Sequence, residues 1–149
     1  MKKNKGPIIL LTEDSDEDYE MTRRALEKAN LDNTLFRCVD GEDTLSYLVK
    51  MRQDDEEKVC PRPDLILLDL NLPGTDGREV LVHLKKIDCM KTIPVIILTT
   101  SFNERDIQQC YLAGANSYIV KPIDFFAFMR VIQCMYQYWF KVTSLPRST

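Results

Sequence analysis

The chain has 149 residues, a formal net charge of −3 and a hydrophobic content of 44%. This size suits one domain that buries its own core, so we expect a single domain over residues 1–149, with its core at about 7–140 and a short C-terminal extension over 141–149. The apolar content excludes a disordered chain, and the acidic balance argues against a nucleic-acid partner, which needs a basic face.

Signals for membranes and for metal thiolates are weak throughout the sequence. No run approaches the roughly 18 apolar residues of a membrane span, so we expect no membrane partner. The five cysteines are scattered without a CxxC pair, which is typical of reduced thiols in a cytoplasmic protein. His83 has no cysteine at ligand spacing, which argues against zinc. We therefore expect a soluble, cytoplasmic protein.

The first half of the chain alternates apolar runs with helical patterns. Residues 8–11 are uniformly apolar, and residues 16–29 follow at helical spacing behind Ser15, a residue type that caps helices. Residues 35–39 are a weaker strand candidate before a second helix that Asp40 can cap. The charged segment 52–62 (RQDDEEKVCPR) indicates a solvated loop longer than usual, with a partner contact as the less favoured alternative.

The second half repeats the alternation three more times. Apolar runs at 65–68 and 95–98 each precede a helical pattern, and such continuous runs suit strands covered on both faces. Residues 117–120 are a weaker strand candidate, and they too precede a helical pattern. Five strand–helix units in this rhythm predict right-handed crossovers and a doubly wound parallel α/β sheet of strand order 2-1-3-4-5. The candidate caps of the last three helices are Asp76, Asn103 and Asp124.

Polar side chains follow four of the five predicted strands. Glu13 and Asp14 come after the first strand and Asp69 after the third. Thr99 and Lys121 come after the fourth and fifth. The carboxyl ends of neighbouring parallel strands form the ligand crevice of this fold class, so these residues should converge. Three carboxylates in one crevice repel one another unless a cation lies among them, and oxygen ligands of this kind suit Mg²⁺.

The same set of residues can carry phosphoryl chemistry. An aspartate in such a site can attack phosphorus and form an acyl phosphate. Lys121 can offset the charge of the phosphoryl oxygens, and Thr99 can hydrogen-bond to them. Each residue alone has an ordinary explanation, as a helix cap, a strand end or a solvated lysine. Their combination at four strand ends favours the functional interpretation.

Four motifs resemble the receiver domains of two-component response regulators. They are LTED (11–14), DLNLPGTDG (69–77), LTT (98–100) and YIVKP (118–122). The resemblance covers about residues 7–140. It implies a flavodoxin-like (βα)5 fold and a regulatory protein, not an enzyme with turnover, that accepts a phosphoryl group from a partner histidine kinase.

The resemblance also implies roles for individual acidic-site residues. Asp69 looks like the phosphoacceptor. Glu13 and Asp14 look like the carboxylates that bind Mg²⁺ together with Asp69, and Asn71 would give the metal its backbone carbonyl.

Further implied roles concern the phosphoryl group and the switch. Thr99 and Lys121 would bind the phosphoryl group, and the Lys121–Pro122 peptide bond would be cis, which costs less before proline than elsewhere. Tyr118 matches the aromatic switch position that moves together with Thr99. Thr100 departs from the family, which usually has a very small residue there, and it could narrow access to the phosphoacceptor.

A narrower resemblance is to the small single-domain response regulators of cyanobacterial phytochromes. It rests on the run RPDLILLDLNLP (62–73), on DGREVL (76–81) and on the ending YWFKVTSLP (138–146). This resemblance implies a phytochrome histidine kinase as the phosphodonor and light as the input.

The last predicted helix is more apolar than the single stripe of a surface helix requires. The surplus predicts a homodimer through Phe128, Ile132, Met135 and Trp139, close to the switch tyrosine. The alternative is a monomer whose C-terminal tail folds back over the helix. Because we expect no effector domain after this helix, the output should be a protein contact.

Three other functions compete with this interpretation. A phosphatase with an aspartyl-phosphate intermediate would place its nucleophile in a DxD motif after the first strand, but the candidate here follows the third. A flavodoxin-like flavin protein needs a loop that accepts a phosphate after the first strand, and the acidic segment 12–16 would repel that phosphate. A receiver-like binding module that no longer uses phosphate is the remaining alternative, which Thr100 leaves open.

Overall fold

A computed structural model describes residues 6–29, 32–53 and 60–146 of the chain. Five parallel strands form one sheet in the order β2-β1-β3-β4-β5, which confirms the predicted doubly wound, flavodoxin-like topology. The strands are β1 (Ile8–Thr12), β2 (Thr34–Cys38), β3 (Leu65–Leu68), β4 (Val95–Thr99) and β5 (Ser117–Val120).

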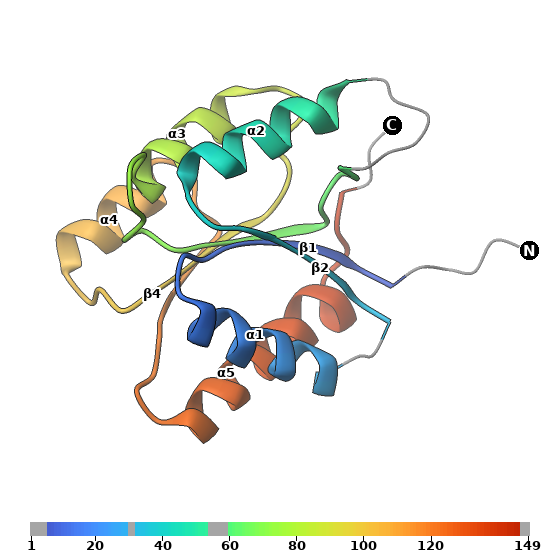
Figure 1. The fold of residues 1–149 in the computed structure, drawn as a ribbon, viewed down its shortest axis with the longest axis vertical. Helices are drawn as coiled ribbons and strands as arrows, with labels where there is room; N and C mark the ends of the chain where they lie inside the picture. Colours follow the sequence, from blue (N-terminus) through green and yellow to red (C-terminus); the bar gives the residue numbers. More distant parts are fainter. Residues whose placement is uncertain (1–5, 30–31, 54–59, 147–149) are drawn as a thin grey trace, which may run out of the picture.

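Helices cover both faces of this sheet (Figure 1). Two of them, α1 and α5, lie side by side on one face, and the other three lie on the opposite face. Right-handed crossovers explain this arrangement, because the connection from β1 to β2 runs one way along the sheet and places its helix on one face. The three later connections, from β2 to β3, β3 to β4 and β4 to β5, run the other way and place their helices on the opposite face. The helices are α1 (Asp16–Ala29), α2 (Gly41–Arg52), α3 (Gly77–Lys86), α4 (Glu104–Leu112) and α5 (Phe125–Gln137), followed by the π-helical turn η1 (Tyr138–Val142).

Each α-helix begins directly after the cap residue that the sequence predicts. A side-chain oxygen at each cap accepts a hydrogen bond from a backbone N–H in the first turn, which satisfies a donor that the helix itself cannot pair. Gly114 follows the end of α4 with a positive φ of 107°, a conformation that favours glycine. The caps are Ser15, Asp40, Asp76, Asn103 and Asp124.

The strands divide the apolar core into two layers. Because successive strand residues point to opposite faces, Ile9 and Leu11 of β1 pack toward α1 and α5, whereas Leu10 packs toward the other helices. The same alternation holds along β3 and β4, whose apolar residues are fully or almost fully buried. This packing holds the carboxyl ends of β1, β3 and β4 at one edge of the sheet.

The predicted dimer interface on the last helix is wrong for two of its four residues. Phe128 and Ile132 are buried inside the protomer, where they pack with residues of α1 and of the sheet, whereas Met135, although largely buried, lines a groove at the surface. The wide apolar surface of α5 is explained within the protomer, because this helix packs against both the sheet and α1. Trp139 is half-buried against the same layer.

The predicted cis bond between Lys121 and Pro122 is also wrong, because the described residues contain no cis peptide bond. Trans is the lower-energy form even before proline. The lysine side chain reaches its partners with the bond in that form.

Two further expectations concern the charged loop and membrane-spanning helices. The charged segment 52–62 includes residues 54–59, which lie outside the described residues. Within the described ranges, no helix combines the length and the apolar character needed to cross a bilayer.

Candidate functional site

The sheet brings the predicted site residues together at one edge. Glu13 and Asp14 leave the end of β1, and Asp69 leaves the end of β3. One carboxylate oxygen from each of these three residues lies within 4.8 Å of the other two. Glu13 and Asp69 are buried, whereas Asp14 is exposed. The cluster is therefore open to solvent on the side of Asp14.

A buried lysine completes this cluster. Lys121 follows β5, where its backbone N–H donates to Thr99 O at 2.7 Å. Its Nζ donates to Glu13 Oε1 at 2.5 Å, to Asp69 Oδ2 at 3.1 Å and to Asp18 Oδ2 at 2.8 Å. One ammonium group thus bridges three carboxylates, two that directly follow β1 and β3 and one from α1.

Burial and charge act in opposite directions on this ammonium. Burial alone lowers its pKa, but the hydrogen bond to Asp18, the charge of Asp69 and the contact with Glu13 outweigh it and leave the pKa of Lys121 raised. The lysine is therefore held in its charged form.

Glu13 responds in the way expected of a buried carboxylate. Burial raises its pKa to about 7, although the hydrogen bond and the charge of Lys121 oppose the shift. The nearby charge of Asp69 adds to the rise, and Ser15 N–H, which donates to Glu13 Oε2 at 3.3 Å, counters it. In the protein without a metal ion, the site therefore destabilises the ionised form of the Glu13 side chain.

The loop after β3 approaches the backbone of Asp69 very closely. A Cβ atom at Gly77 would lie 2.2 Å from the Asp69 carbonyl oxygen, so no larger residue fits there without a shift of backbone. Asn71 N–H donates to Asp69 Oδ1 at 3.2 Å and orients the carboxylate. The Asn71 side chain reaches across to β4, where Nδ2 donates to Thr99 Oγ1 at 3.4 Å.

A hydrogen-bonded chain links β5 to the helices beside the site. Tyr118 OH donates to Ser101 O at 2.9 Å, and Ser101 Oγ donates to Asp106 Oδ2 at 2.7 Å. Asp106 also pairs with Arg78 of α3, with 2.7 Å between Oδ1 and Nη2. The predicted switch tyrosine is thus half-buried and tied to the connection between β4 and α4. Thr100, in the same connection, is exposed.

Sequence reasoning missed two residues that contact the site. Asp18 lies in the first turn of α1, directly after the connection that carries Glu13 and Asp14, and this position could have indicated it. Arg37 of β2 donates from Nε to the backbone oxygen of Glu13 at 3.0 Å. No local pattern marks this arginine, because its contact depends on the pairing of β2 with β1.

The donor set at this edge fits a hard divalent cation. All three candidate ligands are carboxylate oxygens, and one of them faces solvent, where a partly hydrated Mg²⁺ can enter. Lys121 already balances part of the negative charge, so the site combines a metal-binding cluster with a fixed ammonium.

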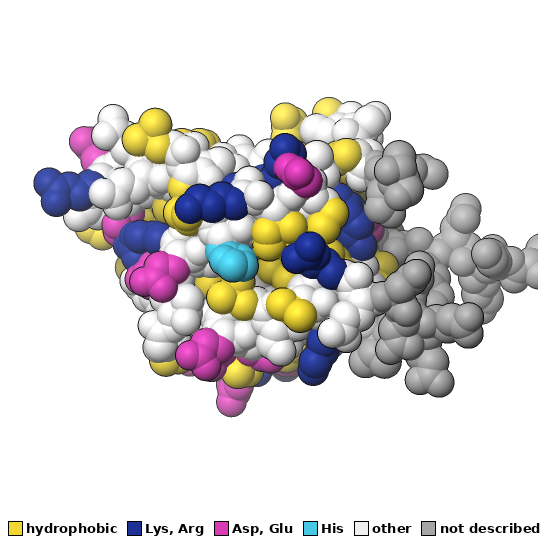
Figure 2. All heavy atoms as spheres, turned by 90° about the horizontal axis from the view of Figure 1, so that it is seen from above, with side chains coloured by type: hydrophobic (Ala, Val, Ile, Leu, Met, Phe, Trp, Pro, Cys, Tyr) yellow, Lys and Arg dark blue, Asp and Glu magenta, His cyan; other side chains and the backbone are white. Residues whose placement is uncertain are grey.

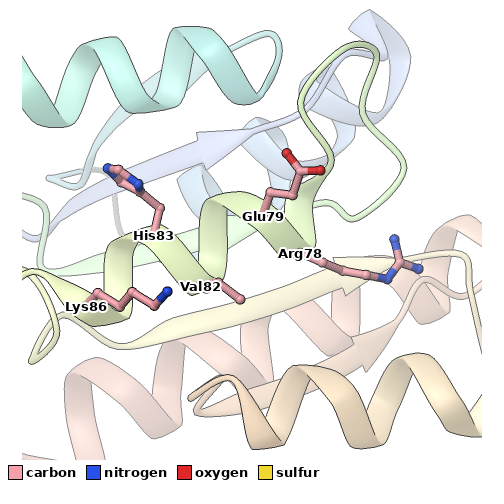
Figure 3. A pocket seen from close by; sticks show the side chains of 5 residues that line it. All are labelled: Arg78, Glu79, Val82, His83 and Lys86. Atoms are coloured by element: carbon pink, nitrogen blue, oxygen red, sulfur yellow. The ribbon is translucent and has the colours of Figure 1, made fainter.

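A separate groove lies on the outer side of α3, away from these residues. It encloses about 340 Å³ and is lined by Arg78, Glu79, Val82, His83 and Lys86 (Figure 3). The space-filling view of this face shows the single histidine among apolar side chains with lysines and arginines nearby (Figure 2). Among the candidate site residues, none lines this groove.

Comparison with known proteins agrees with this geometry. The family description "Response regulator receiver domain" matches residues 9–133 of the chain. The chain belongs to the response regulator receiver domain family. Members of this receiver family are signalling proteins rather than classical enzymes.

Similar receiver proteins come from phytochrome signalling. Response regulator Rcp1 of Synechocystis sp. (strain ATCC 27184 / PCC 6803 / Kazusa) is 37% identical over 145 residues, which cover 97% of each chain. The Mn²⁺-bound form of Rcp1 superposes with a TM-score of 0.83 at 37% identity, covering 95% of this chain and 100% of that one. The phosphorylated cyanobacterial phytochrome response regulator RcpA superposes with a TM-score of 0.85 at 35% identity, covering 95% of this chain and 99% of that one.

Proposed function

We propose that this receiver protein accepts a phosphoryl group on Asp69 from a phytochrome-type histidine kinase and signals through protein contacts. The observation that carries the proposal is the meeting of Glu13, Asp14, Asp69 and Lys121 at one edge of the sheet. Mg²⁺ is the expected metal, with Asn71 contributing its backbone carbonyl as a further ligand.

In the proposed reaction, a carboxylate oxygen of Asp69 attacks the phosphorus of a phosphohistidine. The new P–O bond forms as the P–N bond breaks, and the leaving imidazole nitrogen keeps the electron pair and takes a proton from solvent. A bound Mg²⁺ supplies positive charge that stabilises the phosphoryl oxygens.

The remaining residues bind the transferred group. Lys121 lies 3.1 Å from Asp69 Oδ2, so its ammonium can move from the carboxylate to a phosphoryl oxygen without leaving the site. Thr99 can donate its hydroxyl to another phosphoryl oxygen. Its present contact with Asn71 is long, at 3.4 Å, and is easily exchanged.

The proposed conformational switch follows when Thr99 exchanges its contact with Asn71 for one with the phosphoryl group. Movement of Thr99 toward the phosphoryl group pulls on the connection that carries Ser101, whose backbone oxygen accepts the hydrogen bond from Tyr118. Phosphorylation should therefore change how Tyr118 is held against α4. This proposal explains how an event at Asp69 reaches the outer surface of β5.

The decisive experiment is the intact mass of the protein after incubation with acetyl phosphate and Mg²⁺. We expect one added phosphoryl group in the wild type, and none in Asp69→Asn or after chelation of Mg²⁺. A folded wild-type protein that gains no mass from acetyl phosphate or from a phosphorylated kinase would instead be a receiver-like module that binds partners without phosphate.

The kinase assignment rests on similarity to Rcp1 and RcpA and is tested separately. A radiolabelled phytochrome histidine kinase should lose its label to the wild type within minutes and keep it when mixed with Asp69→Asn. Equal transfer from an unrelated histidine kinase would contradict a phytochrome-type partner while leaving the phosphoacceptor role intact.

We also propose a homodimer, through the part of α5 that stays exposed. A groove of about 590 Å³ runs between β5, α5 and η1, and Val131, Cys134 and Trp139 are among its lining residues. An apolar groove beside the edge strand of a sheet is a suitable contact for a second copy of the chain.

A further inference from the structure

The guanidinium of Arg37 reaches the connection between β1 and α1. It lies in β2, and its side chain is only 19% exposed. Nε donates to the backbone oxygen of Glu13 at 3.0 Å, and Nη1 donates to Asp16 Oδ1 at 2.8 Å. The guanidinium carbon lies 4.7 Å from the centre of the Tyr19 ring, in the geometry of a cation–π contact.

These contacts fix the peptide unit that joins Glu13 to Asp14. Glu13 N–H donates to Cys38 O at 2.9 Å, so β2 holds both polar atoms of the Glu13 backbone. The Glu13 carbonyl lies in the plane that continues into the Asp14 nitrogen. Holding this carbonyl therefore sets the direction in which Asp14 leaves the chain.

Asp14 depends on this backbone restraint more than its neighbours do. Within the described ranges, Glu13 and Asp69 each accept side-chain hydrogen bonds, whereas no hydrogen bond restrains the exposed carboxylate of Asp14. A flexible ligand must lose conformational freedom when it binds a metal, and a preorganised one has less to lose.

The charge of Arg37 does not explain its presence beside this cluster. A positive charge near a cation site disfavours binding of the cation. In addition, Nη2 of Arg37 is buried and has no hydrogen-bond partner among the described residues, which is unfavourable for the folded state. Arg37 can therefore favour metal binding only through the backbone geometry that its hydrogen bonds fix.

We propose that Arg37 is a positioning residue for the metal site, which fixes the Glu13–Asp14 peptide unit and so preorganises Asp14 for a divalent cation. The proposal rests on the metal-dependent function proposed above. The planar guanidinium can bind the carbonyl and Asp16 while it stacks on Tyr19, which the single ammonium of a lysine cannot do.

The test compares Mg²⁺ affinity by isothermal titration calorimetry in the wild type, Arg37→Met and Arg37→Lys. We expect Arg37→Met to weaken binding about tenfold, the size of one hydrogen bond from a charged donor, and Arg37→Lys to fall between it and the wild type. The rate of labelling by acetyl phosphate should fall at low Mg²⁺ and recover at saturating Mg²⁺.

The control is Arg24→Met, the same substitution at an exposed arginine of α1. It removes a cation without touching the connection after β1, so Mg²⁺ affinity should stay at the wild-type value. Circular dichroism and thermal melting identify any variant that fails to fold. Tyr19→Leu provides a second variant, which removes the stacking on Arg37 but keeps the charge of Arg37. We expect Tyr19→Leu to weaken Mg²⁺ binding as well.

The sign of the effect decides the proposal. If Arg37 acted only as a charge, Arg37→Met would bind Mg²⁺ more tightly than the wild type, and this result or unchanged affinity would overturn the positioning role. Wild-type protein without Mg²⁺ binding would also overturn it. Because calorimetry needs no phosphodonor, a protein that binds Mg²⁺ but takes no phosphoryl group would contradict the proposed function alone.

Discussion

Lys121 is the residue on which the charge balance of the site depends. Its ammonium contacts carboxylates from three different elements and is 5% exposed at the side chain. Removing one partner from a buried ionic cluster leaves the others uncompensated, which is strongly destabilising.

Replacement of Lys121 by methionine should therefore lower the free energy of unfolding by about 3 kcal/mol in the presence of a chelator. Mg²⁺ should recover part of this loss, because it replaces the missing positive charge among the carboxylates. Urea unfolding with EDTA and with Mg²⁺ measures both effects. Lys86→Met, at an exposed position of α3, is the control and should change little. Equal stability of Lys121→Met and the wild type in EDTA would contradict this account.

Gly77 is a position where even one added carbon atom would collide with the backbone of Asp69. Gly77→Ala places a methyl group against the Asp69 carbonyl, and the resulting overpacking should cost about 2 kcal/mol and slow phosphorylation at saturating Mg²⁺. The comparison is Gly74→Ala, which meets no atom within 4 Å but has a positive φ of 71°. That variant should lose about 1 kcal/mol and keep its labelling rate. Chemical unfolding and acetyl phosphate labelling distinguish the two.

Residues with a local signature could be predicted from the sequence, and residues defined by distant contacts could not. Asp69 and Lys121 stand directly after apolar runs, so the strand ends predict where they lie. Arg37 has no such signature, since its role depends on which strand pairs with β1. The prediction of a cis bond before Pro122 was wrong, because it rested on a resemblance and not on a contact or pattern in this sequence.

At the scale of elements, an ion pair joins α3 to α4 close to Tyr118. The hydrogen bond from Ser101 and the pairing with Arg78 lower the pKa of Asp106 below its ordinary value of 3.8. A carboxylate with a depressed pKa stabilises the fold above its ordinary pKa, and this contribution disappears as the pH falls through the pKa of the folded state.

Asp106→Asn should consequently destabilise the protein at pH 7 by about 1 kcal/mol and have a smaller effect near pH 3. Urea unfolding of both proteins at several pH values gives this difference directly. Glu104→Gln, an exposed change on the same helix, controls for the general effect of acid. A penalty that grows below pH 4 would contradict the assignment.

The helices themselves show which parts of the architecture are local. Asp40, Asp76 and Asp124 cap their helices through contacts two or three residues away, so the helix starts were predictable. The covering of α5 was not, because it is provided by α1, about a hundred residues earlier in the chain. The apolar surplus of α5 was therefore attributed to a partner instead of to the protomer.

At the scale of the whole molecule, the proposed dimer can be tested with two matched valines. Val131 lines the groove between β5 and α5, and Val82 lines the groove on α3 (Figure 3). In sedimentation velocity, Val131→Asp should shift the protein to monomer, because a buried charge at the interface is unfavourable, whereas Val82→Asp should sediment like the wild type. A wild-type protein that stays monomeric at high concentration, with and without phosphorylation, would rule the dimer out.

The distance along the chain between Glu13 and Lys121 has a consequence for biosynthesis. The two residues touch in the finished fold but are separated by 108 positions in sequence. During translation, the acidic residues leave the ribosome long before the lysine that neutralises them. A nascent chain that ends before β5 lacks this counter-charge, so it cannot assemble the complete site. The complete site is thus assembled late in synthesis, when β5 joins the sheet.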